Sequence, residues 1–304
     1  MKISAIIGLL LIFQSLRGQT SIVVLGTIQD AGSPQIGCTN DCCKNLFNQP
    51  DHSRQVVSLG LYDSKQKMSY LFEATPDISK QLRLLKTYSK SPTDLPNGIF
   101  LTHAHIGHYT GLMFLGKEAL NAKDLPVYAM PKMKSFLEQN GPWSQLVNQE
   151  NIQIQSLFEN QAIRLGDSIS VTPLLVPHRD EYSETVGYII TGPNKKLLFI
   201  PDIDKWEKWK QDINTLISEV DYALIDATFF DAAEINNRPI REIPHPFVIE
   251  SMNRFASLPL KEKQKIHFIH FNHTNPLLNK KSAARLQVLK AGFKIAQQGN
   301  VFKL

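Results

Sequence analysis

Three of the nine histidines fall within six residues, at His103, His105 and His108. They follow the apolar residues 98–101, which predict a short buried strand. Two histidines separated by one residue point in similar directions from an extended turn, and the third can begin the next helix. Because zinc is bound by neutral imidazoles that converge on one point, this spacing predicts a metal site. The alternative is a group of histidines on a surface loop.

The histidine cluster resembles a family motif. Its sequence, His103-Ala104-His105-Ile106-Gly107-His108, is similar to the H-x-H-x-D-H motif of the metallo-β-lactamase superfamily. The resemblance spans residues 21–278 and implies three more metal ligands, each at the end of a predicted strand. These are His178 after Leu-Val-Pro, Asp202 after Phe-Ile-Pro as a bridging carboxylate, and His270 between Ile and Phe.

Position 107 departs from the family motif, because glycine stands where the family has aspartate. The resemblance implies that the first metal site keeps an open position for water, as catalytic zinc requires. Its ligands are His103, His105 and His178. The second site loses one anionic oxygen and keeps His108, Asp202 and His270. We therefore expect weak binding there, a water in place of the aspartate, or a different metal. A turn with a positive φ angle is another reason for Gly107.

Four further segments narrow the resemblance. Residues 26–38, 73–77, 225–229 and 270–276 are similar to the branch of the superfamily that contains PQQ biosynthesis protein B, the phosphoribosyl cyclic phosphodiesterases and tRNase Z. The superfamily resemblance implies an α/β (α+β) fold, a four-layer αββα sandwich. Strand patterns that alternate with helical patterns along the chain also favour two sheets covered by helices.

The hydrophobic pattern predicts the elements that position these residues. We expect strands at residues 21–26, 56–62, 69–73, 98–101, 170–175, 185–191, 196–200, 222–226 and 267–271. We expect helices at residues 78–88, 108–120, 206–218, 247–256 and 279–291. The candidate ligands therefore lie at the ends of strands.

The three cysteines, Cys38, Cys42 and Cys43, form a C-x₃-C-C cluster. An odd number of cysteines within six residues is a poor disulfide framework, whereas thiolates favour zinc. The family resemblance implies that His273, three residues after the last predicted catalytic histidine, completes a structural zinc site. Reduced thiols, or one disulfide with an unpaired thiol, are the alternatives.

Three more residues have roles that the resemblance implies. His245 resembles the proton donor of relatives similar to tRNase Z, and a departing alkoxide needs such a donor. Asp226 and Thr228 would orient His245 or a ligand histidine. A histidine at the start of a helix, with a surface role only, is the alternative for His245.

The ends and the bulk composition limit the choice of partners. Residues 1–19 combine a basic start, a short apolar run and a small-residue exit, which predict a signal peptide and export to the periplasm or beyond. Residues 20–304 are expected to form a single domain without a membrane span. The net charge of +5 and a pI of about 8.9 come without basic runs, so they do not indicate nucleic acid. We expect a small-molecule substrate, and the composition leaves the oligomeric state open.

Three functions are compatible with these residues. The first is a metal-dependent hydrolase of a phosphodiester or ester, in which zinc lowers the pKa of bound water to about 7. Asp202 would position that water and His245 would protonate the leaving group. The second is an iron-dependent oxidoreductase of the PQQ-biosynthetic type. The third is a ligand-binding protein without catalysis. The predicted cofactors are one catalytic zinc, a weak second ion and one structural zinc, with iron as the alternative.

Overall fold

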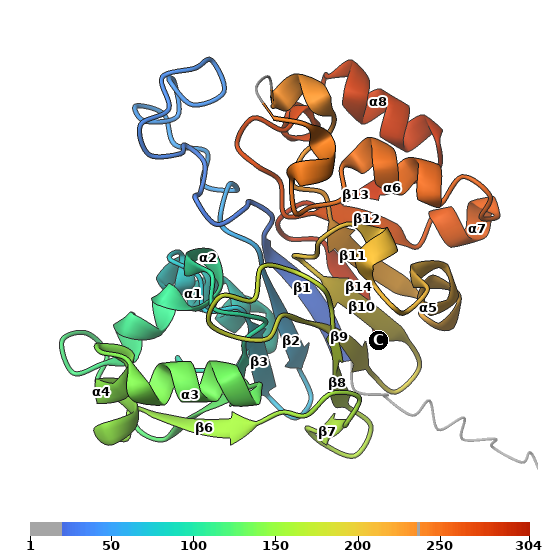
Figure 1. The fold of residues 1–304 in the computed structure, drawn as a ribbon. Coiled ribbons are helices and arrows are strands. Elements are labelled where there is room, and N and C mark those ends of the chain that lie inside the picture. Colours follow the sequence, from blue (N-terminus) through green and yellow to red (C-terminus); the bar gives the residue numbers. More distant parts are fainter. Residues whose placement is uncertain (1–19, 236–237) are drawn as a thin grey trace, which may run out of the picture.

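Two mixed sheets of seven strands each pack face to face in the computed structural model (Figure 1), which describes residues 20–235 and 238–304. The aromatic side chains of Phe72, Phe100, Tyr188 and Phe199 fill the space between the sheets. The predicted signal peptide at residues 1–19 lies outside the described residues. No helix in the described part of the chain is both long enough and apolar enough to cross a bilayer.

The first sheet has the order β14-β1-β2-β3-β4-β5-β6. Its strands are β1 (Thr20–Gly26), β2 (Ser58–Asp63), β3 (Met68–Phe72), β4 (Gly98–Phe100), β5 (Leu125–Ala129), β6 (Ile152–Ser156) and β14 (Val301–Lys303). The pairs from β14 to β3 are antiparallel, and those from β3 to β6 are parallel.

The second sheet has the order β13-β12-β11-β10-β9-β8-β7. Its strands are β7 (Ile163–Arg164), β8 (Ser170–Leu175), β9 (Val186–Thr191), β10 (Lys196–Ile200), β11 (Tyr222–Asp226), β12 (Ile266–Ile269) and β13 (Lys294–Ile295). The pairs from β13 to β10 are parallel. The carboxyl ends of β10, β11 and β12 therefore lie side by side at one edge of this sheet.

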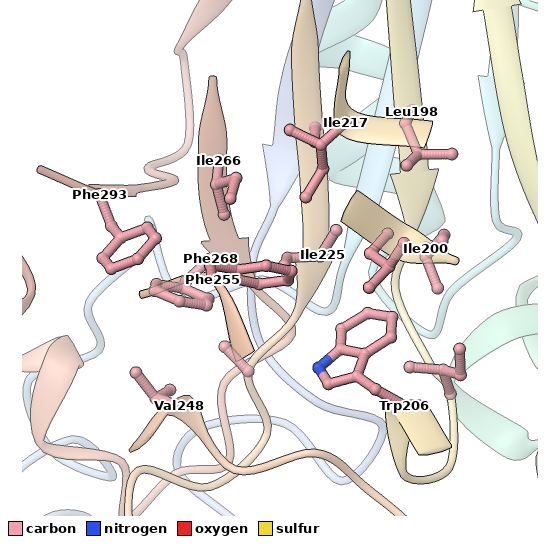
Figure 2. Close-up of a cluster of buried hydrophobic side chains, with 14 of the residues drawn as sticks. Leu198, Ile200, Trp206, Ile217, Ile225, Val248, Phe255, Ile266, Phe268 and Phe293 are labelled. Atoms are coloured by element: carbon pink, nitrogen blue, oxygen red, sulfur yellow. The ribbon is translucent and has the colours of Figure 1, made fainter. Parts of the chain in front are cut away.

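Helices cover the outer face of each sheet. Those beside the first sheet are α1 (Ile78–Ser89), α2 (Ile106–Tyr109), α3 (Pro131–Gln139), α4 (Trp143–Asn148) and the 3₁₀ segment η1 (Thr110–Leu115). Those that follow in the chain are η2 (Trp206–Lys208), α5 (Ile213–Glu219), η3 (Ala232–Glu234), η4 (Ile240–Glu242), α6 (Val248–Arg254), α7 (Leu260–Lys263), η5 (Pro276–Leu278) and α8 (Ala283–Lys290). Figure 2 shows how Trp206, Ile217 and Phe255 pack against strand residues of the second sheet. The predicted four-layer αββα sandwich is confirmed.

Two predicted helices are wrong in extent. Instead of one helix at residues 108–120, the chain forms the short α2 and then η1. A Cβ atom on Gly111 would lie 2.1 Å from the carbonyl oxygen of Thr75, so the chain passes too close to its neighbour for a larger residue. Instead of one helix at residues 206–218, η2 ends at Lys208 and Asp212 caps the separate helix α5.

Candidate metal centre

The turn after β4 carries two histidines whose rings present different nitrogens to the same point. His103 Nε2 lies 2.8 Å from His105 Nδ1. The other nitrogen of each ring has its own partner: Thr102 Oγ1 lies 2.9 Å from His103 Nδ1, and Glu181 Oε2 lies 3.1 Å from His105 Nε2. Such outward partners fix the orientation and tautomer of a ligand histidine.

Two residues from the second sheet complete this group. His178 follows β8 and Asp202 follows β10. Asp202 Oδ2 lies 3.2 Å from His178 Nε2 and 3.4 Å from His103 Nε2. The four donor atoms of His103, His105, His178 and Asp202 lie within 4.8 Å of one another. In a tetrahedral zinc site with bonds of about 2.0–2.1 Å, ligand atoms lie roughly 3.3–3.4 Å apart.

Buried atoms without partners show that this group fits a metal ion. Both ring nitrogens of His178 are buried and form no hydrogen bond with other described residues. Buried polar atoms in proteins are nearly always paired, and an unpaired one costs about 1–3 kcal/mol. A cation bound between the imidazoles and Asp202 Oδ2 would give His178 Nε2 the partner that it lacks.

A second group lies next to the first and shares Asp202. It consists of Asp30, His108, Asp202 and His270, again with donor atoms within 4.8 Å of one another. Asp30 Oδ1 lies 2.9 Å from His108 Nε2 and 3.4 Å from His270 Nε2. His108 Nε2 lies 3.9 Å from Asp202 Oδ2, so that oxygen faces both groups. His108, Asp202 and His270 were predicted as ligands from the sequence, whereas Asp30 was not.

Gly107 does not serve a turn with positive φ, so that interpretation is wrong. It lies inside α2 and is not among the glycines with positive φ in the described chain. Its neighbour explains the glycine: a Cβ atom at position 107 would lie 2.5 Å from the Cα atom and 2.7 Å from Oδ1 of Asp30. The chain around Asp30 therefore occupies the space that a side chain at position 107 would need.

Asp226 and Thr228 connect two histidines of the site. Thr228 Oγ1 donates to Asp226 Oδ1 at 2.7 Å and can accept from His270 Nδ1 at 2.8 Å. Asp226 Oδ2 accepts from His245 Nδ1 at 2.8 Å. His270 also has a φ angle of 67°, in the left-handed region that is uncommon for residues other than glycine. These contacts leave Nε2 of both rings free of the Asp226 network.

The charges at the centre are strongly paired. Burial and the neighbouring His108 hold the pKa of His103 well below its usual value, which favours the neutral ring that binds a metal. Burial opposes the charged form of His245, but Asp226 and Asp202 outweigh it and raise the pKa of His245 to about 10. Burial likewise opposes ionisation of Asp202, yet His178 and His245 hold its pKa well below the usual range.

Glu73 is a second buried residue that the sequence analysis did not assign. It follows β3, is fully buried and has a φ angle of 76°. Its Oε1 lies 3.4 Å from His108 Nδ1, the ring nitrogen that faces away from Asp30. An acidic residue directly after a strand that precedes the histidine motif was the available sequence signal. Its position suits a carboxylate that orients His108.

The three cysteines and His273 meet as the resemblance implied. His273 Nδ1 lies 3.4 Å from Cys42 Sγ and 3.3 Å from Cys43 Sγ. Cys42 Sγ lies 3.8 Å from Cys38 Sγ and 3.9 Å from Cys43 Sγ. Sulfur atoms about 2.3 Å from zinc lie ~3.8 Å apart in a tetrahedral site. All three thiols are free of disulfides, and these distances fit four ligands around one ion.

The comparisons with known proteins agree with this architecture. Residues 69–271 match the model of the beta-lactamase superfamily domain. The chain therefore belongs to the metallo-β-lactamase superfamily. It is 23% identical to coenzyme PQQ synthesis protein B of Methylorubrum extorquens over 91% of this chain and 98% of that protein.

Two solved structures are similar to the whole described fold. Zinc-bound PqqB from Methylobacterium extorquens has a TM-score of 0.77 and 22% identity, over 93% of this chain and all of that chain. A diphosphatase of the PhnP family has a TM-score of 0.63 and 19% identity, over 94% of this chain and 97% of that chain. At these identities the two structures show the shared fold. Within this chain, the clustered donor residues support the binding of zinc or another metal ion.

Proposed function

We propose that this chain is a metal-dependent hydrolase that acts on a phosphodiester or ester of a small molecule. The observation that supports it most directly is the convergence of His103, His105, His178 and Asp202 on one point, with buried atoms left unpaired there. When bound, a divalent cation activates water at neutral pH and polarises a substrate oxygen.

The chain's own residues have distinct roles in this proposal. Asp202 Oδ2 faces both ligand groups, so it orients the attacking water, and its negative charge balances the positive charge of the centre. His245 is the acid: its Nδ1 is held by Asp226, which leaves the proton on Nε2 for the leaving group. Near the centre, a cavity of about 310 Å³ is lined by Asp30 and by residues 31–34. We propose that this loop faces the substrate.

The test is hydrolysis of bis(4-nitrophenyl) phosphate and 4-nitrophenyl acetate by the zinc-loaded protein. We expect turnover that a chelator abolishes and zinc restores. His178→Ala should lower kcat/KM by at least about 100-fold, because the metal supplies several kcal/mol of charge stabilisation. The matched control is His267→Ala, since His267 belongs to none of the ligand groups and does not line this cavity. Activity that survives both chelation and His178→Ala would contradict the proposal.

A second candidate is an iron-dependent oxidoreductase. Similarity to coenzyme PQQ synthesis protein B over 91% of the chain favours it, and carboxylate-rich histidine sites also suit iron. Elemental analysis of the purified protein and measurement of oxygen uptake separate the two candidates. Iron in the centre together with substrate-dependent oxygen uptake would replace the hydrolase by the oxidoreductase.

A further inference from the structure

The aspartate that the family motif places at position 107 has a spatial counterpart elsewhere in the chain. Asp30 lies on the segment that leaves β1, 78 residues before His108. Its Oδ1 lies 2.9 Å from His108 Nε2 and 3.4 Å from His270 Nε2. These are the two histidines that the resemblance assigns to the second metal. A carboxylate oxygen therefore faces both of them, although the motif itself contains none.

The backbone holds Asp30 in this position from both sides. Ile28 forms isolated parallel bridges with Val56 and with Phe271. The amide of Gln29 donates to the carbonyl of Phe271 at 2.9 Å, and the amide of Phe271 donates to the carbonyl of Thr27 at 2.8 Å. Because Phe271 directly follows His270, the same hydrogen bonds set the distance between Asp30 and that histidine. The side chain of Asp30 is only 11% exposed.

Gly107 and Asp30 form a complementary pair. A side chain at position 107 would collide with the Cα atom of Asp30 at 2.5 Å, and that collision involves backbone rather than a flexible side-chain end. An aspartate at position 107 and the present path of residues 27–31 therefore exclude each other. The glycine leaves the room through which the segment after β1 brings its own carboxylate to the same place.

We propose that Asp30 replaces the missing aspartate as the anionic ligand of the second metal ion, together with His108, His270 and Asp202. The second site is then a full four-donor site whose carboxylate comes from a different segment of the chain. This inference rests on the proposed metal centre and concerns only its second ion. It predicts that the centre binds two ions.

Equilibrium dialysis against buffered free zinc, followed by elemental analysis, tests this without any substrate. The wild-type chain should bind three ions, two at the centre and one at the cysteines. Asp30→Ala should lose the second ion of the centre, or need at least about tenfold more free zinc to bind it. Even a residue that only hydrogen-bonds to a metal ligand contributes about 10–100-fold to metal affinity. Asp41→Asn is the control, because Asp41 is 91% exposed in the same segment.

Gly107→Ala tests the complementary half of the pair. Its Cβ should displace Asp30 and lower the affinity for the second ion of the centre, as Asp30→Ala does. Gly141→Ala is the control, because its Cβ meets no atom within 4 Å. The proposal is overturned if Asp30→Ala binds zinc as the wild type does, or if the wild type binds only one ion besides the one that Cys38→Ser loses. Either result leaves the hydrolase proposal intact through the first site. A chain that binds three ions but hydrolyses neither substrate would contradict the hydrolase proposal and leave the role of Asp30 intact.

Discussion

His245 is held between two carboxylates, which decides what its proton can do. Its Nδ1 lies 2.8 Å from Asp226 Oδ2 and 3.1 Å from Asp202 Oδ1. These neighbours raise its pKa to about 10 against the opposing effect of burial, which favours the protonated ring. A protonated imidazole beside a metal group is suited to donate to a leaving group rather than to bind the metal.

The leaving group of the substrate tests this role. His245→Ala should lower kcat by about 100-fold or more on 2′,3′-cyclic AMP, because an alkoxide leaving group needs general-acid help. The same variant should retain most of its activity on bis(4-nitrophenyl) phosphate, whose nitrophenolate leaves without a proton. Equal losses on both substrates would mean that His245 only positions other residues. The kinetic comparison requires zinc content to be measured in both proteins.

The sequence predicted those ligands that belong to the histidine cluster at residues 103–108 or that the family motif of this cluster implies. His103, His105 and His108 were recognisable because three histidines share one turn, and the family resemblance of that turn then implied His178 and Asp202. Asp30 carried no such signal, since an aspartate after a strand is common and its partner His108 lies 78 residues away. Only the three-dimensional path of the segment after β1 reveals it. The glycine at position 107 was the one available hint.

At the scale of elements, the helix predicted at residues 206–218 shows how a cap divides a periodic segment. Apolar residues recur through residues 206–218, which predicted one helix. Instead the side chain of Asp212 accepts hydrogen bonds from the amides of Asn214 and Thr215 and starts α5 there. Residues 209–211 therefore lie outside any helix. The short edge strands β7 and β13, each of two residues, are too brief for periodicity to indicate.

The contribution of this cap is measurable. Asp212→Ala should lower the free energy of unfolding by about 0.5–2 kcal/mol, because two helix amides lose their acceptor. Asp212→Asn is the matched variant: it keeps a capping oxygen and removes only the charge that pairs with Arg254. We expect Asp212→Asn to remain close to the wild type in urea unfolding. If both variants lose the same stability, the ion pair and not the cap is responsible.

At the scale of the whole molecule, residues 27–57 leave the first sheet and return to it as one long excursion (Figure 1). The excursion carries Asp30 near its start and all three cysteines in its middle. It is tied to the second sheet twice, by Ile28 next to Phe271 and by the cysteines next to His273. The spacing of the cysteines, and the position of His273 three residues after His270, allowed the cysteine site to be predicted from the family resemblance. The order did not show that both attachments involve the loop that follows β12.

Removal of the cysteine-bound ion should therefore weaken the site at Asp30. Cys38→Ser should lose the cysteine-bound ion, and it should need more free zinc to bind the second ion of the centre. Without the cysteine-bound ion residues 27–57 have one attachment fewer, so more chain entropy opposes their ordering. The first central ion should be unaffected. The readout is again zinc bound per chain in equilibrium dialysis, with Asp41→Asn as control. If the wild type and Cys38→Ser bind the same number of zinc ions per chain, the structural zinc site itself is contradicted.

The three-residue spacing of His270 and His273 has a consequence for the metal loading of the molecule. Two ions attached to one short loop are thermodynamically linked, and such linkage acts equally in both directions. An ion at Asp30 should tighten the cysteine site as much as the cysteine ion tightens the site at Asp30. Chains that hold only one of these two ions should then be rare at intermediate zinc, and the population should divide between singly loaded and fully loaded molecules.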